Sequence, residues 1–104
     1  MSGADRERET HDRKVRQIAR ELKKAGYNVK ADIRGYAHPS TIGKYKRRPD
    51  IEATRSGHRK IVEVETPRSL TSDKEQIKTF IRHAAQKKRT SLDIVVTKPR
   101  KSRR

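Results

Sequence analysis

Hydrophobic positions recur along the chain with two different periods, which divide it into helical and extended segments. From about Thr10 the apolar residues follow helical spacing up to Gly26, a residue that can end a helix in the left-handed conformation. An alternating segment follows at residues 27–33, and Gly35 ends it. The sequence therefore predicts a helix followed by a strand with one buried side.

The clearest extended pattern lies in residues 48–66. Two alternating runs are joined by Ser56-Gly57, a dipeptide suited to a turn, so this segment predicts a β-hairpin. Alternation places the apolar side chains Ile51, Ala53, Val62 and Val64 on one face of the sheet. The other face then carries four carboxylates near one end: Asp50, Glu52, Glu63 and Glu65.

A helix and a last strand are predicted after the hairpin. Pro67 stops the second hairpin strand, and Ser72-x-x-Glu75 has the form of a capping box. The helical stripe that follows ends around residues 88–90 and consists of Ile77, Phe80, Ile81, Ala84 and Ala85. Residues 92–97 form a short, largely apolar run, which favours a strand inside the sheet, parallel to residues 61–65.

These elements define an α/β fold with the order α-β-β-β-α-β and a mixed four-stranded sheet flanked by helices. With 104 residues, the chain fits one domain, which we place at residues 12–97. Residues 1–11 are expected to form a flexible or a helical extension. Residues 98–104 are expected to be a basic, disordered tail.

The charge points to a polyanionic partner. A formal net charge of +16, from 29 Lys and Arg against 13 Asp and Glu, exceeds what solubility requires, and nucleic acid fits it, DNA before RNA. An anionic membrane fits less well, because neither predicted helix opposes a basic face to a bulky apolar one. The chain has no cysteine, no apolar run of membrane-spanning length and no leader pattern, so we expect a soluble cytoplasmic protein.

Two basic segments are the expected nucleic-acid contacts. The loop before the hairpin supplies Lys44, Tyr45, Lys46, Arg47 and Arg48, and the tail supplies Lys98, Arg100, Lys101, Arg103 and Arg104. Lysine and arginine neutralise phosphates, and tyrosine can stack on a base or donate to a phosphate. The alternative for the loop, and for the basic face of the first helix, is simple solvation.

Clustered carboxylates need a separate explanation in so basic a chain. Neighbouring carboxylates repel and raise one another's pKa values unless a cation or a proton lies between them. Hard divalent ions such as Mg²⁺ bind one or two carboxylates together with substrate phosphate oxygens. The hairpin therefore suggests a metal site that faces a phosphate.

Pro49-Asp50, a turn, and Glu63-x-Glu65 at the end of an apolar strand resemble the motif of the PD-(D/E)xK nuclease superfamily, which has the restriction-endonuclease-like fold. The resemblance implies that Asp50, Glu63 and the carbonyl of Val64 bind Mg²⁺ or Mn²⁺. Glu65 stands where that family usually has lysine, and it would accept the proton of the attacking water or join a second metal site.

Two further positions resemble family motifs more weakly. Gln76-Ile-Lys-Thr-Phe80 is similar to the Q-x-x-x-Y motif of the RecB-like branch, which implies either a Gln76 that faces the carboxylates or an exposed one, with Phe80 in the core. Glu21 is a candidate for the glutamate that the family carries on its first helix. The four histidines form no zinc motif and are expected at the surface, with His38 and His58 as candidates for substrate contact.

The resemblance implies a metal-dependent endonuclease that hydrolyses DNA, similar to small archaeal-type Holliday junction resolvases and therefore a candidate for branched or repair intermediates and for a homodimer. A catalytically inactive, nucleic-acid-binding protein of the same fold is the alternative, because the motif lysine is missing. A basic RNA-associated protein is the third possibility.

Overall fold

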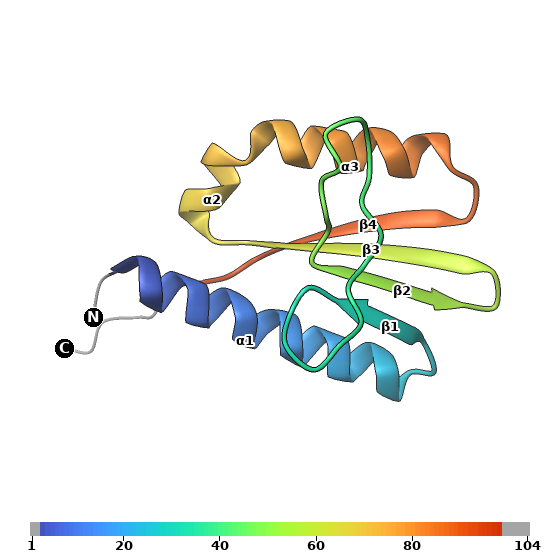
Figure 1. The fold of residues 1–104 in the computed structure, drawn as a ribbon, viewed down its shortest axis with the longest axis horizontal. Helices are drawn as coiled ribbons and strands as arrows, with labels where there is room; N and C mark the ends of the chain where they lie inside the picture. The colour runs from blue at the N-terminus through green and yellow to red at the C-terminus, as the bar shows by residue number, and fades with distance from the viewer. Residues whose placement is uncertain (1–2, 99–104) are drawn as a thin grey trace.

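The computed structural model describes residues 3–98 of the chain. The elements follow one another as α1 (Gly3–Lys24), β1 (Asn28–Ala31), β2 (Ile51–Arg55), β3 (His58–Glu65), α2 (Pro67–Ser72), α3 (Lys74–Gln86) and β4 (Thr90–Val96). The strands form one sheet in the order β1-β2-β3-β4, in which the first three are antiparallel and β4 runs parallel to β3 (Figure 1). The predicted α/β class with a mixed four-stranded sheet and flanking helices is confirmed.

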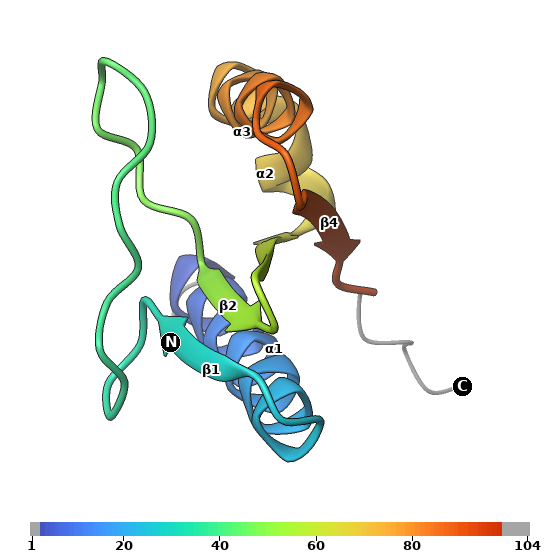
Figure 2. The same ribbon diagram turned by 90° about the vertical axis from the view of Figure 1, so that its right-hand side faces the viewer.

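Helix α1 covers one face of the sheet, as Figure 2 shows from the side. Val15 and Ala19 are fully buried against the hairpin residues Ile51, Ala53 and Val62. The strand alternation predicted from the sequence produces this face, because Ile51 lies opposite Val62 in the β2–β3 register. Helix α1 begins at Gly3, so residues 3–11 are helical and continue into the stripe that packs on the sheet.

The hairpin has the turn that its sequence predicts. Ser56 and Gly57 both have positive φ, at 49° and 80°, which matches the right-handed twist of the two strands that they join. The first strand is shorter than predicted: β1 ends at Ala31, whose backbone N–H donates to the carbonyl of Ala37 in the following loop at 2.9 Å. Within residues 3–98, no helix has the length and apolar content needed to span a bilayer.

Helix α3 and the loop between β1 and β2 cover the opposite face of the sheet. Ile42 of the loop, Ile61 of β3 and Phe80 of α3 are buried together there, with exposed fractions of 3% or less. In Figure 1 the loop crosses in front of the sheet and reaches α3. Periodicity did not reveal this packing, because the loop contributes Ile42 alone to this buried cluster of the described residues.

The predicted capping box at Ser72 and Glu75 is wrong. A short helix, α2, already begins at Pro67, and its capping box pairs Thr66 with Ser69 through bonds of 2.8 Å and 3.0 Å. The chain turns as soon as β3 ends, and proline fits the first turn of a helix, where its missing N–H needs no partner. Asp73 is the cap residue of α3, without a side-chain cap bond.

The last strand is not inside the sheet. The parallel pairing of β4 with β3 is confirmed, but β4 is an edge strand, and Ile94 and Val96 are 37% and 41% exposed. Helix α3 covers this edge only partly: Ile77 and Phe80 of its apolar stripe are buried, whereas Ile81 is 50% exposed. The apolar run reflected contact with one neighbouring strand and one helix.

Candidate functional site

An acidic cleft of about 500 Å³ lies where β2 begins and β3 ends, between the start of α1, helix α2 and the start of α3. Its acidic lining residues are Glu7, Asp12, Asp32, Asp50, Glu63, Glu65 and Asp73. These seven are more than half of the 13 acidic residues in a chain with 29 basic ones. The fold has therefore gathered its scarce negative charge at one place.

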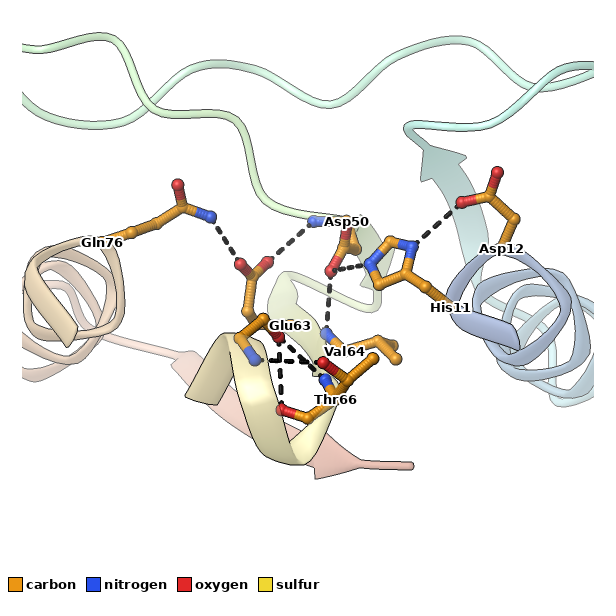
Figure 3. A network of polar contacts seen from close by, with 8 residues as sticks. His11, Asp12, Asp50, Glu63, Val64, Thr66 and Gln76 are labelled. Atoms are coloured by element: carbon orange, nitrogen blue, oxygen red, sulfur yellow. Dashed lines mark hydrogen bonds and ion pairs between the residues drawn. The ribbon is translucent and has the colours of Figure 1, made fainter. Parts of the chain in front are cut away.

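Asp50 and Glu63 are brought together across neighbouring strands, as Figure 3 shows. The backbone N–H of Asp50 donates to Glu63 Oε1 at 3.2 Å. The backbone N–H of Val64 donates to Asp50 Oδ2 at 2.8 Å, which fixes the Asp50 carboxylate against β3. The backbone N–H and C=O of Val64 both point to the β2 side of β3. The carbonyl of the next residue, Glu65, points to the opposite side, where it accepts from the N–H of Thr97.

Glu63 is buried, with 2% of its surface exposed. Gln76 donates from α3 to Glu63 Oε2 at 2.6 Å, so Gln76 faces the carboxylates. Burial, and to a smaller extent the negative charge of Asp50, raise the pKa of Glu63 to about 9. Glu63 therefore holds a proton at neutral pH when no cation is beside it.

Glu65 is equally buried, and one of its oxygens lacks a partner. Within the part of the chain that the structure describes, no group donates a hydrogen bond to the buried Oε1 of Glu65. Burial, followed by contact with Asp73, raises the pKa of Glu65 to about 7. A buried carboxylate oxygen without a donor is costly, and a cation or a proton would relieve this cost.

The sequence analysis missed His11, which it assigned to the surface. Its Nε2 lies 3.2 Å from Asp50 Oδ2, and its Nδ1 lies 2.9 Å from Asp12 Oδ1 (Figure 3). The hydrogen bond to Asp50 outweighs the effect of burial and raises the pKa of His11 to about 9, so the ring is positively charged at neutral pH.

Helical phase is the signal that would have placed His11. It lies four residues before the buried Val15, and Glu7 lies eight residues before it, so both continue the buried stripe of α1 toward the N-terminus. Polar residues at the end of an apolar stripe mark the point where a helix leaves the core and borders a site. Glu21, the candidate chosen from the sequence, is exposed and lies outside the acidic cleft.

Glu52 does not join the other three hairpin carboxylates. It accepts from Arg59 Nε at 2.6 Å and from the backbone N–H of Ser40 at 3.0 Å. It therefore anchors the loop to the sheet, and it does not line the acidic cleft. His38 and His58 also lie outside this cleft, His38 beside Asp32 and His58 beside Ser91.

The basic residues Lys44, Tyr45, Lys46, Arg47 and Arg48 form the tip and the end of the loop that packs against α3. Tyr45 is 70% exposed, and the cations of Lys44 and Arg47 lie 5.1 Å and 5.6 Å from its ring centre. Lys98 is exposed just after β4. The other predicted contacts of the tail, Arg100, Lys101, Arg103 and Arg104, lie outside the described residues.

The side-chain oxygens that line the cleft are of the type that a hard cation prefers as ligands. They are carboxylate oxygens, one of them buried without a donor, and the His11 cation already lies against Asp50. In residues 3–98, however, no three His, Cys, Asp or Glu side chains are arranged closely enough to be recognised as a metal site. The cleft thus offers suitable ligands that must move closer to enclose an ion.

Comparison of the chain with family models, with curated proteins and with solved structures gives no match.

Proposed function

We propose that the protein is a metal-dependent endonuclease of the PD-(D/E)xK type that hydrolyses DNA phosphodiester bonds, with branched or repair intermediates as candidate substrates. One observation carries this proposal: Asp50, Glu63 and Glu65 line one acidic cleft of a chain whose net charge is +16. An acidic centre in a basic body suits a cation that meets a phosphate of a bound polyanion.

Asp50, Glu63 and the Val64 carbonyl would hold Mg²⁺ or Mn²⁺ in the cleft. Such an ion supplies positive charge to the phosphate and acidifies a bound water. The chain's own residues set the geometry: the Val64 N–H orients Asp50, and the Gln76 amide orients Glu63. His11 holds Asp50 from the side of α1.

Glu65 is the residue that would take the proton of the attacking water. A general base works best when its pKa lies near the working pH, and burial raises the pKa of Glu65 to about 7. An ordinary exposed glutamate would be a far weaker base. This environment offers a physical reason why glutamate could serve at a position where the resembled family usually has lysine.

A catalytically inactive nucleic-acid-binding protein is the second candidate. Two observations favour it: lysine is absent from the motif, and within residues 3–98 no compact three-ligand group is formed. In that case the loop and the basic surfaces would bind DNA, and protons alone would neutralise Glu63 and Glu65.

A cleavage panel separates the two candidates. Supercoiled plasmid, four-way junction, duplex and single-stranded DNA should be incubated with the protein in Mg²⁺, in Mn²⁺ and in EDTA. The nuclease should cut at least one substrate with a divalent ion, and the double variant D50N/E63Q should lose this cleavage while it keeps its affinity for DNA. The matched control is E21Q, an exposed glutamate outside the cleft.

Two results would contradict the nuclease proposal. Cleavage that survives in D50N/E63Q would place the activity elsewhere or in a contaminant. A wild-type protein that binds DNA but cuts none of the four substrates would favour the inactive binder.

A further inference from the structure

A second pocket, of about 200 Å³, lies between the loop tip and α3, apart from the acidic cleft. Its base is formed where the loop touches the helix: Ile42 is buried in the core, and a side chain at Gly43 would come within 3.1 Å of Thr79 Cγ2. The close approach of loop and helix and a φ of 79° both favour glycine at this position. The pocket is thus part of the folded structure.

The loop that forms one wall is held at several points. The backbone groups of Ile42 and Arg47 exchange two hydrogen bonds of 2.7 Å and 2.9 Å, which close the tip. Ser40 is bound to Glu52 of β2, and Arg48 donates to the carbonyl of Pro39 at 3.2 Å. A ligand in the pocket would therefore meet a wall that is already ordered.

The loop wall combines an aromatic ring with cations. Tyr45 presents an exposed ring that lines the pocket, with the Lys44 ammonium and the Arg47 guanidinium near it. Bases stack on aromatic rings in a sequence-tolerant way, and lysine and arginine neutralise the adjoining phosphates. One wall thus offers contacts for both parts of a nucleotide.

The helix wall adds hydrogen-bonding groups of fixed character. Arg59 Nη1 lies 2.6 Å from His83 Nε2, and because a guanidinium can only donate, the histidine nitrogen accepts. Burial, followed by the charge of Arg59, lowers the pKa of His83, so the ring is neutral and carries its proton on Nδ1. Arg82 and Gln86 complete this wall with a cation and an amide.

One face of α3 connects the pocket to the acidic cleft. Gln76 lines the cleft and His83 lines the pocket. The two residues are seven positions apart, which is two helical turns on one face and about 10 Å along the axis. A DNA strand that lies along α3 could therefore occupy both places at once.

We propose that this pocket binds one unpaired nucleotide of a DNA strand, with the base on Tyr45 and the phosphate on Lys44 and Arg82. Its place next to a scissile phosphate rests on the proposed function. The pocket would make the protein prefer a strand with an unstacked base, because a base inside a duplex is covered on both faces and cannot reach the Tyr45 ring.

Binding in EDTA tests the pocket without cleavage. The affinity of a short labelled single strand and of a fully paired, blunt-ended duplex should be measured at one fixed salt concentration for wild type, Y45A, Y45F and T41A. Y45A should weaken single-strand binding about fivefold or more, since stacking of one base on an aromatic ring contributes that much, and change duplex binding less than about twofold. Y45F keeps the ring, and T41A changes an exposed loop residue outside the pocket, so both should match wild type.

If Y45A lost affinity equally for both DNA forms, or lost none, the proposal that the pocket binds an unpaired nucleotide would be wrong. Thermal unfolding should show the same stability for all four proteins, because the Tyr45 side chain is largely exposed. The result is independent of the cleavage panel. If Y45A selectively loses single-strand affinity while the wild type cuts none of the substrates, nucleotide binding in the pocket is supported and the nuclease proposal is refuted. Cleavage by the wild type together with unchanged binding by Y45A supports the nuclease and refutes the pocket.

Discussion

Asp50, Glu63 and Glu65 lie in one cleft but meet different surroundings. Asp50 is held by a backbone N–H and by the charged His11. Glu63 is buried beside Asp50 and is protonated, and Glu65 has a pKa of about 7. The cleft therefore balances its negative charge with two protonated groups, His11 and Glu63, and those protons occupy positions that a metal ion would compete for.

This competition predicts the direction in which stability changes with pH. Folding raises the pKa of His11 from 6.5 and that of Glu63 from 4.5, both to about 9. The folded state then binds more protons than the unfolded state through Glu63 between about pH 4.5 and 9, and through His11 as well between about pH 6.5 and 9. Stability therefore falls as pH rises through this interval. Urea unfolding in EDTA should show the decline, and Mn²⁺ should reduce it. A stability that increases toward pH 9 would contradict these protonation states.

His11 should compete with a metal ion at neutral pH. With a pKa of about 9, only about one His11 ring in a hundred is neutral at pH 7, so a metal ion must displace a cation that lies against Asp50. H11A should therefore bind Mn²⁺ between about tenfold and a hundredfold more tightly than wild type, as measured by calorimetry. H58A is the matched control, because His58 lies outside the cleft, beside Ser91. Weaker binding by H11A would instead make His11 a ligand of the metal.

At the scale of elements, the turn from β3 into α2 positions the cleft. Thr66 and Ser69 cap α2 directly after Glu65. Ser69, in the first turn of α2, and Asp73, which follows α2, both line the cleft. The sequence pattern of a capping box did not identify Thr66 and Ser69, because serine stands at the third helical position, where glutamate or glutamine is usual. It selected Ser72 instead, whose hydroxyl only donates to the Ser69 carbonyl of its own helix at 3.4 Å.

The two positions can be compared directly by mutation. T66A removes a cap bond and should lower the free energy of unfolding by about 1 kcal/mol. S72A removes only an exposed bond within the helix and should change it by less than about 0.5 kcal/mol. Urea unfolding measures both, and a larger loss for S72A would contradict the observed start of α2.

The loop between β1 and β2 shows why some elements escape sequence patterns. Ile42 anchors the loop tip against α3, and Glu52, which alternation grouped with the acidic cluster, holds the loop backbone through Ser40. Neither contact has a period along the chain. The hairpin could be predicted because each of its contacts repeats every second residue.

For the whole molecule, the separation of charge is the dominant feature. Most acidic residues lie in one cleft, whereas the loop tip and the exposed face of α1 are basic. A polyanion would meet these surfaces, and each phosphate contact should contribute about 0.9 to the dependence of log affinity on log salt.

Salt dependence can identify which basic surface contacts DNA. K44A/K46A should reduce the slope for duplex binding by about 1 to 2, because both lysines lie at the exposed loop tip. K23A/K24A removes the same charge from the end of α1 and should leave the slope unchanged if that face is only solvated. Fluorescence anisotropy over a salt series measures both, and a larger change for K23A/K24A would move the DNA path to α1.

The sequence by itself determined the elements whose contacts are periodic: the apolar stripes of α1 and α3 and the hairpin with its turn at Ser56-Gly57. It also determined the parallel pairing of β4. It also placed Asp50 and Glu63 at adjacent ends of two strands. These features follow from backbone geometry and from alternation, which act locally.

Only the tertiary structure decided which distant groups meet. It brought His11 to Asp50, turned Gln76 toward Glu63, removed Glu52 from the carboxylate group and closed the loop over α3. Each of these contacts depends on how helices and loops pack on the sheet, and a one-dimensional pattern does not contain that information. The pKa values of Glu63, Glu65 and His11 depend on the same packing, because burial and neighbouring charges set them.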